Sequence, residues 1–192
     1  MKIILASKSK RRKDLLNKLN LNFEIVDSCF DESTVLVNHT NPEKYCLNLA
    51  CKKAQIVSQK FPADLIIGAD TIVYHNKIIL GKPKDKNDAR HQLESLSDNE
   101  HIVFTGVNIL NKKSKINESF VDSTIVKFNQ LNKKDILFYI DNYKPFDKAG
   151  SYGIQNWSSI FVDKIDGCYY NVVGFPLPKF YKLLNNILME IK

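Results

Sequence analysis

Basic side chains crowd the predicted start of a helix near the N-terminus. Ser9 has the character of an N-cap, which places Lys10, Arg11 and Arg12 in the first helical turn. Because a helix N-terminus carries partial positive charge, each of these cations is unfavourable there by about 0.3–1 kcal/mol. Free backbone N–H groups, a serine hydroxyl and two guanidinium groups together favour a bound anion such as phosphate. The alternative is a solvated basic helix start that binds nothing.

A second unusual cation stands in the next predicted helix. The apolar side chains of that helix form one stripe, and Lys53 falls near the middle of it. An unpaired ammonium group is costly to bury, so Lys53 must either extend to solvent or meet a negative group. A phosphate group in a cleft would meet that need, and extension to solvent is the alternative.

Carboxylates stand in two segments that could join these cations. Asp70 follows the apolar run 65–69, and we expect it at the carboxyl end of a buried central strand, where open α/β sheets bind ligands. A carboxylate there can hold Mg²⁺ or activate water, although it can also simply end the strand in a turn. Glu32 lies in the second acidic stretch, and Lys82 adds a cation on a loop stiffened by the next proline.

This set of groups suits phosphoryl chemistry, which needs charge neutralisation, a metal ion and an oriented water. The sequence contains neither a G-x-x-x-x-G-K-[ST] phosphate loop nor a G-x-S-x-G elbow, which argues against Walker-type NTPases and α/β-hydrolases. Its four histidines and four cysteines lack the spacing of zinc ligands. Any metal here is therefore expected to be a hard cation held by oxygen.

The elements that must position these residues alternate along the chain. In the first half we predict strands at 1–6, 21–26 and 65–69, helices at 9–19, 41–58 and 85–97, and a hairpin at 71–80. Asn41 and Pro42 begin the second helix, Asp85 caps the third, and the hairpin turns at Asn76-Lys77.

In the second half we predict strands at 101–110 and 115–128, a helix that Asn132 caps, and a closing helix from Pro176. Asp166-Gly167 indicates a further hairpin between strands at 159–165 and 168–173. This order predicts an α/β fold with a mixed sheet. The length of 192 residues suits a single domain, 1–192, made of two closely packed lobes.

Bulk properties narrow the class of protein further. The net charge of +7 fits a polyanionic partner, although a general bias towards lysine and asparagine would give the same value. A nucleic-acid-binding protein and a noncatalytic nucleotide sensor thus stay open at this point. The apolar runs are far too short to cross a bilayer. We expect the four cysteines to be reduced and to serve as small side chains of the core, which indicates a cytoplasmic protein.

Six sequence blocks, in order, resemble the Maf family of nucleotide pyrophosphatases, and the likeness spans about residues 3–184. The blocks are Leu5-Ala6-Ser7-Lys8-Ser9-Lys10-Arg11-Arg12, Leu49-Ala50-Cys51-Lys52-Lys53-Ala54, Ile67-Gly68-Ala69-Asp70-Thr71-Ile72-Val73 with Gly81-Lys82-Pro83, Leu96-Ser97 with His101 and Thr105-Gly106-Val107, Asp147-Lys148-Ala149-Gly150-Ser151-Tyr152-Gly153-Ile154-Gln155, and Val172-Val173-Gly174-Phe175-Pro176-Leu177.

The resemblance implies a strongly curved mixed sheet with flanking helices in two lobes around a central cleft, similar to inosine triphosphate pyrophosphatases. It implies hydrolysis of a nucleoside triphosphate to a monophosphate and pyrophosphate with Mg²⁺ or Mn²⁺, a homodimer, and a link to restraint of cell division. Carried onto this sequence, the residues expected to grip the triphosphate are Ser9, Arg11, Arg12, Lys53 and Lys82. Glu32 and Asp70 would serve the metal and the attacking water, with Asp70 as the general base.

Three residues bear on the nucleobase. Arg12, Thr71 and Gln155 resemble the branch of the family that takes dTTP, UTP and modified pyrimidine nucleotides, and Gln155 offers both a donor and an acceptor. The alternative is a branch that hydrolyses 7-methylguanosine triphosphate or another purine nucleotide. The sequence departs from the family pattern at Lys10, where proline is usual, and at Asn156-Trp157, where a glycine-rich continuation is usual.

Overall fold

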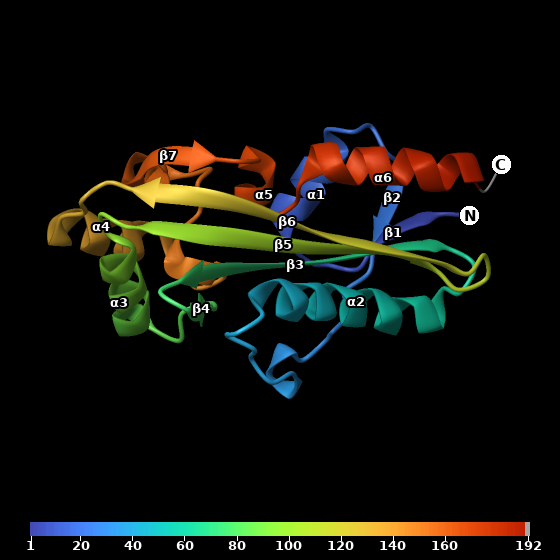
Figure 1. Ribbon diagram of the computed structural model, residues 1–192, viewed down its shortest axis with the longest axis horizontal. Coiled ribbons are helices and arrows are strands. Elements are labelled where there is room, and N and C mark those ends of the chain that lie inside the picture. Colours follow the sequence, from blue (N-terminus) through green and yellow to red (C-terminus); the bar gives the residue numbers. More distant parts are fainter. Residues whose placement is uncertain (191–192) are drawn as a thin grey trace.

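A seven-stranded mixed sheet runs the length of the molecule, in a computed structural model that describes residues 1–190 (Figure 1). The strand order is β2-β1-β3-β5-β6-β7, with β4 paired to β3. Strands β1, β2 and β3 are parallel to one another, and the other pairings are antiparallel. The bounds are β1 Ile3–Leu5, β2 Phe23–Ile25, β3 Leu65–His75, β4 Ile78–Leu80, β5 Glu100–Asn111, β6 Ile116–Phe128 and β7 Val162–Asp166. The predicted mixed α/β class is confirmed.

Within residues 1–190, six α-helices and three short 3₁₀ helices flank this sheet. They are α1 Lys10–Asn17, α2 Pro42–Lys60, α3 Lys86–Leu96, α4 Lys133–Tyr143, α5 Tyr169–Val173 and α6 Leu177–Glu190, with η1 Glu32–Thr34, η2 Ala149–Ser151 and η3 Trp157–Phe161. The four predicted N-caps are confirmed, because each side chain accepts a hydrogen bond from a backbone N–H three residues later; they are Ser9, Asn41, Asp85 and Asn132. Within residues 1–190, none of the helices combines the length and apolar character that crossing a membrane requires.

The edge of β3 that faces β1 and β4 contains a gap. Strand β1 pairs with the first part of β3 and ends opposite Ile67, whereas β4 pairs only from Val73 onward. Between these two partners, residues 69–72 have no strand beside them on that edge within the described part of the chain. The predicted hairpin with its turn at Asn76-Lys77 is confirmed, since both turn residues have positive φ.

The two faces of the sheet carry different helices. Helix α2 packs on β3 and β5 over two small apolar clusters that include Ile66 and Ile72. The main core cluster contains Ile67 and Val73 of β3 together with apolar side chains of α1, α3, α4 and α6. Because successive side chains of a strand point to opposite faces, Asp70 faces α2 whereas Thr71 faces the main cluster. Figure 1 shows α2 on the opposite side of the long strands from α1 and α6.

Two glycines let α2 lie unusually close to the sheet. A Cβ atom at Gly68 would stand 2.2 Å from the Ala50 carbonyl oxygen, and one at Gly106 would stand 2.9 Å from the Leu47 Cα. Either substitution would push α2 away, because the obstacles are backbone atoms rather than flexible side-chain ends. The close approach fixes the height of α2 above the middle of β3.

Two predictions about the elements and one about a cysteine were wrong. Asp70 does not end a strand: β3 continues without a break to His75, because Thr71 to Tyr74 pair with β5. The second strand of the hairpin predicted at Asp166-Gly167 is helix α5, which the buried amide of Asn171 joins to the Val103 carbonyl and the Thr124 hydroxyl. Cys29 is exposed rather than a core residue, although all four thiols are free. The single-domain boundary 1–192 stays a prediction.

Candidate active site

A cleft of about 970 Å³ opens at the gap beside β3. Strand β1 leads from one side into the start of α1, and β4 leads from the other side into the loop that carries Lys82. All nine side chains that the sequence singled out line this cleft: Ser9, Arg11, Arg12, Glu32, Lys53, Asp70, Thr71, Lys82 and Gln155. These nine side chains therefore share one groove, whereas their individual roles stay predictions.

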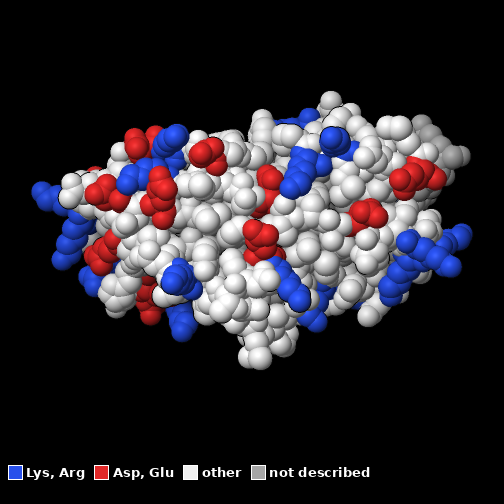
Figure 2. Space-filling model, viewed as in Figure 1, with Lys and Arg blue, Asp and Glu red and all other residues white. Residues whose placement is uncertain are grey.

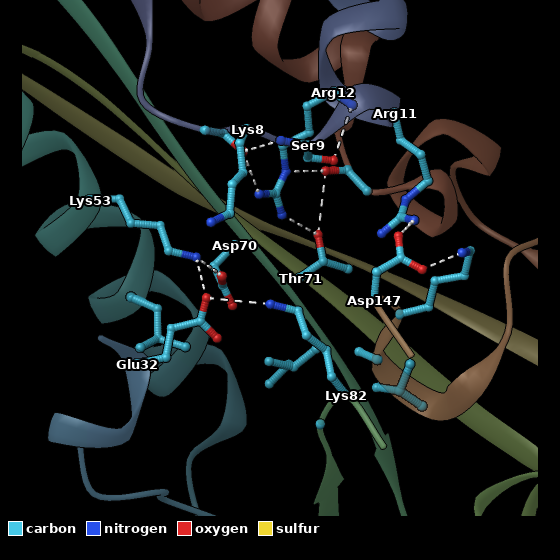
Figure 3. A pocket seen from close by; sticks show the side chains of 18 of the residues that line it. Lys8, Ser9, Arg11, Arg12, Glu32, Lys53, Asp70, Thr71, Lys82 and Asp147 are labelled. Atoms are coloured by element: carbon cyan, nitrogen blue, oxygen red, sulfur yellow. Dashed lines mark hydrogen bonds and ion pairs between the residues drawn. The ribbon is translucent and has the colours of Figure 1, made fainter. Parts of the chain in front are cut away.

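Three charged side chains form what we call the acid–lysine cluster, on the α2 face of the sheet: Glu32, Lys53 and Asp70. The Lys53 ammonium group donates to a Glu32 carboxylate oxygen at 2.8 Å and also to Asp70 Oδ1 (Figure 3). Lys53 and Asp70 are buried, and Glu32 is half-buried. Lys53 thus meets negative groups instead of extending to solvent, which settles the question that its place in the apolar stripe raised.

Backbone packing holds this cluster in place. Lys53 belongs to α2, which Gly68 admits close to β3, two residues before Asp70. The Cys46 thiol lies 3.4 Å from the Asp70 carbonyl oxygen and accepts a hydrogen bond from the Gly106 N–H. Glu32 begins the 3₁₀ helix η1, which Asp31 caps through the Ser33 N–H. Each charged group therefore stands on a segment with its own local restraint.

The two carboxylates of the cluster respond to their surroundings in opposite directions. Burial raises the pKa of Asp70, and the nearby charges of Lys53 and Arg12 oppose this rise only in part. Burial also acts on Glu32, but the attraction of Lys53, with smaller contributions from Lys82 and Arg12, lowers its pKa overall. Two neighbouring carboxylates whose pKa values separate in this way suit an acid–base site, with Asp70 the more basic of the two.

Arg12 forms the second arrangement, on the opposite face of the sheet, which we call the arginine fork. Its guanidinium group donates to the Gly174 carbonyl at 3.0 Å, to the Thr71 hydroxyl at 3.0 Å and to the Ser7 hydroxyl at 3.3 Å. The Thr71 hydroxyl in turn lies 3.0 Å from that of Thr105 on β5. A buried guanidinium group is thus aimed by three neutral oxygens, and its positive charge remains available to a ligand.

The rim of the cleft carries the more exposed members of the predicted set. Arg11 forms an ion pair with Asp147 at 2.8 Å, and Lys82 lies 3.8 Å from a Glu32 oxygen. Ser9 accepts from the Arg12 backbone N–H as the N-cap of α1. Gln155 is exposed at the cleft wall. Figure 3 shows the heads of Arg11 and Asp147 turned toward one another, apart from the acid–lysine cluster.

The donor set of the cleft suits a hard cation. Glu32 and Asp70 offer carboxylate oxygens, and the acid–lysine cluster has two carboxylates against one ammonium group. Among residues 1–190 there is no group of three or more acidic, histidine or cysteine side chains that could hold a metal ion by itself. A divalent ion at Glu32 and Asp70 would therefore complete its coordination with water and ligand oxygens, as Mg²⁺ commonly does.

Sequence reasoning assigned no role to several contacts that complete the site. Ser7 and the Gly174 carbonyl hold Arg12, and Asp147 and Lys148 stand beside Arg11. Ser7, Asp147 and Lys148 lie within the sequence blocks that carry the family resemblance, so the signal was present for them. Gly174 also lies within such a block, but its contact uses a main-chain oxygen, which the residue type does not reveal.

The charge of the whole molecule is less informative than this cleft. Acidic and basic side chains are interspersed over the face shown in Figure 2. The net charge of +7 is therefore not gathered into a continuous basic stripe on that face. The concentration of cations around the buried Asp70 and the half-buried Glu32 is the more specific feature.

The site as a whole is that of a protein that binds a phosphate-bearing anion in a cleft, with acid–base groups at its floor. The sequence pattern of the family described as Maf-like protein matches residues 2–187, and this chain belongs to that family.

Two relatives support this finding. The chain is 49% identical over 193 residues to a dTTP/UTP pyrophosphatase of Clostridium botulinum (strain 657 / Type Ba4), covering 98% of this chain and 96% of the relative. It is 46% identical over 187 residues to a dTTP/UTP pyrophosphatase of Clostridium perfringens (strain SM101 / Type A), covering 97% of each. A HAM1 protein structure from Coxiella burnetii aligns with a TM-score of 0.48 at 12% identity, covering 97% of this chain and 99% of that one.

Proposed function

We propose that this protein hydrolyses dTTP and UTP to the nucleoside monophosphate and pyrophosphate. The observation that carries the proposal is the meeting of the acid–lysine cluster and the arginine fork in one cleft, from opposite faces of the sheet. One arrangement can exchange protons and the other holds a fixed positive charge. The full-length relatives named dTTP/UTP pyrophosphatase support the same activity and the same two substrates.

In the proposed reaction, water attacks the α-phosphorus and the bond to the bridging oxygen breaks, so that pyrophosphate leaves. Asp70 accepts the proton of the attacking water, a role that its raised pKa favours. Lys53 keeps Asp70 oriented and, with Lys82, offsets the charge that develops on the departing pyrophosphate. Ser9 and Arg11 hold the phosphates at the start of α1.

A divalent cation, Mg²⁺ or Mn²⁺, fits the two carboxylates of the acid–lysine cluster. When bound, such an ion neutralises phosphate charge and polarises the phosphoryl group. Glu32 would hold it together with Asp70, and the lowered pKa of Glu32 keeps that carboxylate ionised for the purpose.

The pyrimidine preference is assigned to the fork and to the loop that ends at Gln155. Arg12 and Thr71 present hydrogen-bonding groups at the cleft wall, and Gln155 offers a donor and an acceptor that match the edge of uracil or thymine.

A nucleotide panel tests the substrate and the bond that breaks. The enzyme would be incubated with Mg²⁺ and each of dTTP, UTP, dCTP, dATP, GTP and 7-methylguanosine triphosphate, and the products identified by chromatography. We expect pyrophosphate and a monophosphate from dTTP and UTP. Release of orthophosphate would contradict the proposed bond, preference for a purine would contradict the substrate, and no turnover together with salt-sensitive retention of DNA or RNA would favour the binding alternatives.

The base assignment predicts that Asp70→Asn lowers kcat by about 10²–10⁴-fold, the usual contribution of general base catalysis. The substitution keeps the size of the side chain, so circular dichroism and thermal unfolding should report an intact fold. Turnover within a few-fold of the wild-type value in a folded Asp70→Asn protein would remove Asp70 from this role.

We also infer a homodimer in the cytoplasm with an effect on cell division, in line with the family resemblance and with four free thiols. Light scattering after size-exclusion chromatography tests the dimer, with a mass twice that of the 22.1 kDa chain expected. Overproduction of the wild type and of Asp70→Asn in a bacterial host, with cell length as the readout, tests whether any division effect needs hydrolysis. Equal filament lengths would separate the effect from the reaction.

A further inference from the structure

A lysine next to Arg11 has a position that the proposed reaction does not yet use. Lys148 lines the cleft, and its side chain is 15% exposed. Its stem packs along Gly153, where an added Cβ would stand 2.9 Å from both Cδ and Cε of the lysine. The missing side chain at Gly153 therefore leaves room for the stem of a mostly buried lysine that lines the cleft, and such burial is unusual for a lysine whose only function is solubility.

Asp147 holds this lysine and Arg11 at the same time. One carboxylate oxygen accepts from Arg11 at 2.8 Å, and the other forms an ion pair with Lys148. One negative charge thus serves two cations. The Asp147 side chain is 63% exposed, so it sits at the mouth of the cleft and is the most accessible of the three groups.

The segment that carries this pair is fastened to the opposite rim of the cleft. The Gly150 N–H donates to the Gly81 carbonyl at 3.2 Å, immediately before Lys82. Gly150 has a φ of +68° and leaves no space for a Cβ beside Val73. These contacts hold residues 147 and 148 between the start of α1 and the Lys82 loop. A ligand that contacts both α1 and the Lys82 loop would therefore come within reach of them.

We propose that Lys148 is a further phosphate-binding residue, and that Asp147 is an internal counter-ion which competes with the ligand's phosphate for Arg11 and Lys148. The proposal rests on the proposed function for the identity of the ligand, a nucleoside triphosphate and its product pyrophosphate. A terminal phosphate that displaces Asp147 gains two cations at once. When pyrophosphate leaves, Asp147 takes both cations back, so it favours product release.

The direction in which Asp147→Asn changes the affinity for pyrophosphate separates a competing counter-ion from a merely structural residue. Binding of pyrophosphate to the full-length protein would be measured by calorimetry for the wild type, Asp147→Asn and Lys148→Met. Asp147→Asn removes the competitor, so we expect pyrophosphate to bind about three- to fivefold more tightly, the upper range for an exposed ion pair. If Asp147 only held Arg11 in position, the same variant would bind pyrophosphate more weakly, and the proposal would fall.

Lys148→Met tests the lysine itself. Methionine preserves the apolar stem against Gly153 and removes only the charge, so we expect about fivefold weaker pyrophosphate binding at unchanged thermal stability. Binding equal to that of the wild type in this variant would overturn the assignment of Lys148.

A matched control distinguishes local from global charge. Lys86 and Asp141 form another exposed ion pair, outside the cleft, so Asp141→Asn changes net charge by the same amount as Asp147→Asn. It should leave pyrophosphate binding unchanged, and tightening equal to that of Asp147→Asn would overturn the local mechanism.

Failure of the proposed function would look different. A wild type that releases no pyrophosphate from dTTP or UTP contradicts the proposed reaction, whereas the signs of the binding changes decide the roles of Asp147 and Lys148 on their own.

Discussion

The acid–lysine cluster and the arginine fork occupy the same cleft but are built on different physical principles. In the cluster, the Lys53 ammonium group lies between two carboxylates, and burial raises the pKa of one of them, Asp70. In the fork, the Arg12 guanidinium group is held only by neutral oxygens of Ser7, Thr71 and Gly174. The comparison indicates that the two arrangements have different roles: the cluster suits proton transfer, and the fork suits permanent attraction of an anion.

The strongest test of this comparison removes the charge at the centre of the cluster. Lys53→Met leaves Asp70 buried without its ammonium partner, and breaking a buried ion pair in this way costs about 3–5 kcal/mol. We expect a large loss of stability in urea unfolding and a fall in kcat of at least about 10²-fold, because loss of the Lys53 charge would raise the pKa of Asp70 further and leave less of it ionised.

A double variant separates the two effects. Lys53→Met with Asp70→Asn removes both charges, so much of the lost stability should return while activity stays low. Recovery of activity along with stability would show that the cluster serves only the fold, and would contradict its assigned role in proton transfer.

A smaller effect on activity is expected from substitutions in the arginine fork. Arg12→Lys keeps the positive charge but cannot reach Ser7, Thr71 and Gly174 with one planar group. We predict a KM for dTTP raised about 10- to 100-fold, with kcat changed only a few-fold, in steady-state assays of pyrophosphate release. Thr71→Val, which removes one hydrogen-bonding partner, should raise KM by only about fivefold. A kcat loss as large as that of Asp70→Asn would mean that the fork takes part in the chemistry.

A further expected effect concerns pH and also differs between the two faces. His101 lies on β5, on the same face as Thr105, and burial lowers its pKa to about 3. The unfolded chain takes up this proton near pH 6.5 and the folded chain does not, so stability is full above that pH and falls as pH drops toward 3. The loss is roughly 1.4 kcal/mol for each pH unit within that window.

Urea unfolding of the wild type and of His101→Gln between pH 7 and pH 5 measures the contribution of His101 to the free energy of unfolding. The difference in unfolding free energy between the two proteins should narrow as pH falls, because glutamine does not titrate. The rate, by contrast, should follow ionisation of Asp70, rising with pH through a pKa above the usual value for aspartate. A constant difference in stability would rule out His101 as the titrating group.

Local chemistry made much of this molecule readable from its sequence. The caps at Ser9 and Asn41 and the turn at Asn76-Lys77 were predictable, because each depends on a few neighbouring residues. Lys53 stood out because a cation in an apolar stripe needs a partner, and the partners proved to be Glu32 and Asp70.

The remaining features depend on contacts that are distant along the chain. The apolar run before Asp70 gave no sign that β3 continues past it, since that continuation depends on pairing with β5. The Asp166-Gly167 pair predicted a hairpin with a strand at 168–173, but the buried amide of Asn171 fixes a helix there. The pairing of Arg11 with Asp147 joins residues 136 positions apart and has no local signature.

The unbroken course of β3 has a consequence for how this site can vary. Asp70 and Thr71 are adjacent residues that serve opposite faces of one sheet, so their relative geometry is set by the pleat alone. Deleting a single residue before them would exchange their orientations, pointing the carboxylate at the guanidinium group and the hydroxyl at the ammonium group. Substitutions that keep the alternation of side chains along β3 can change the acid–lysine cluster or the arginine fork separately. An insertion or deletion before Asp70 would disrupt both at once.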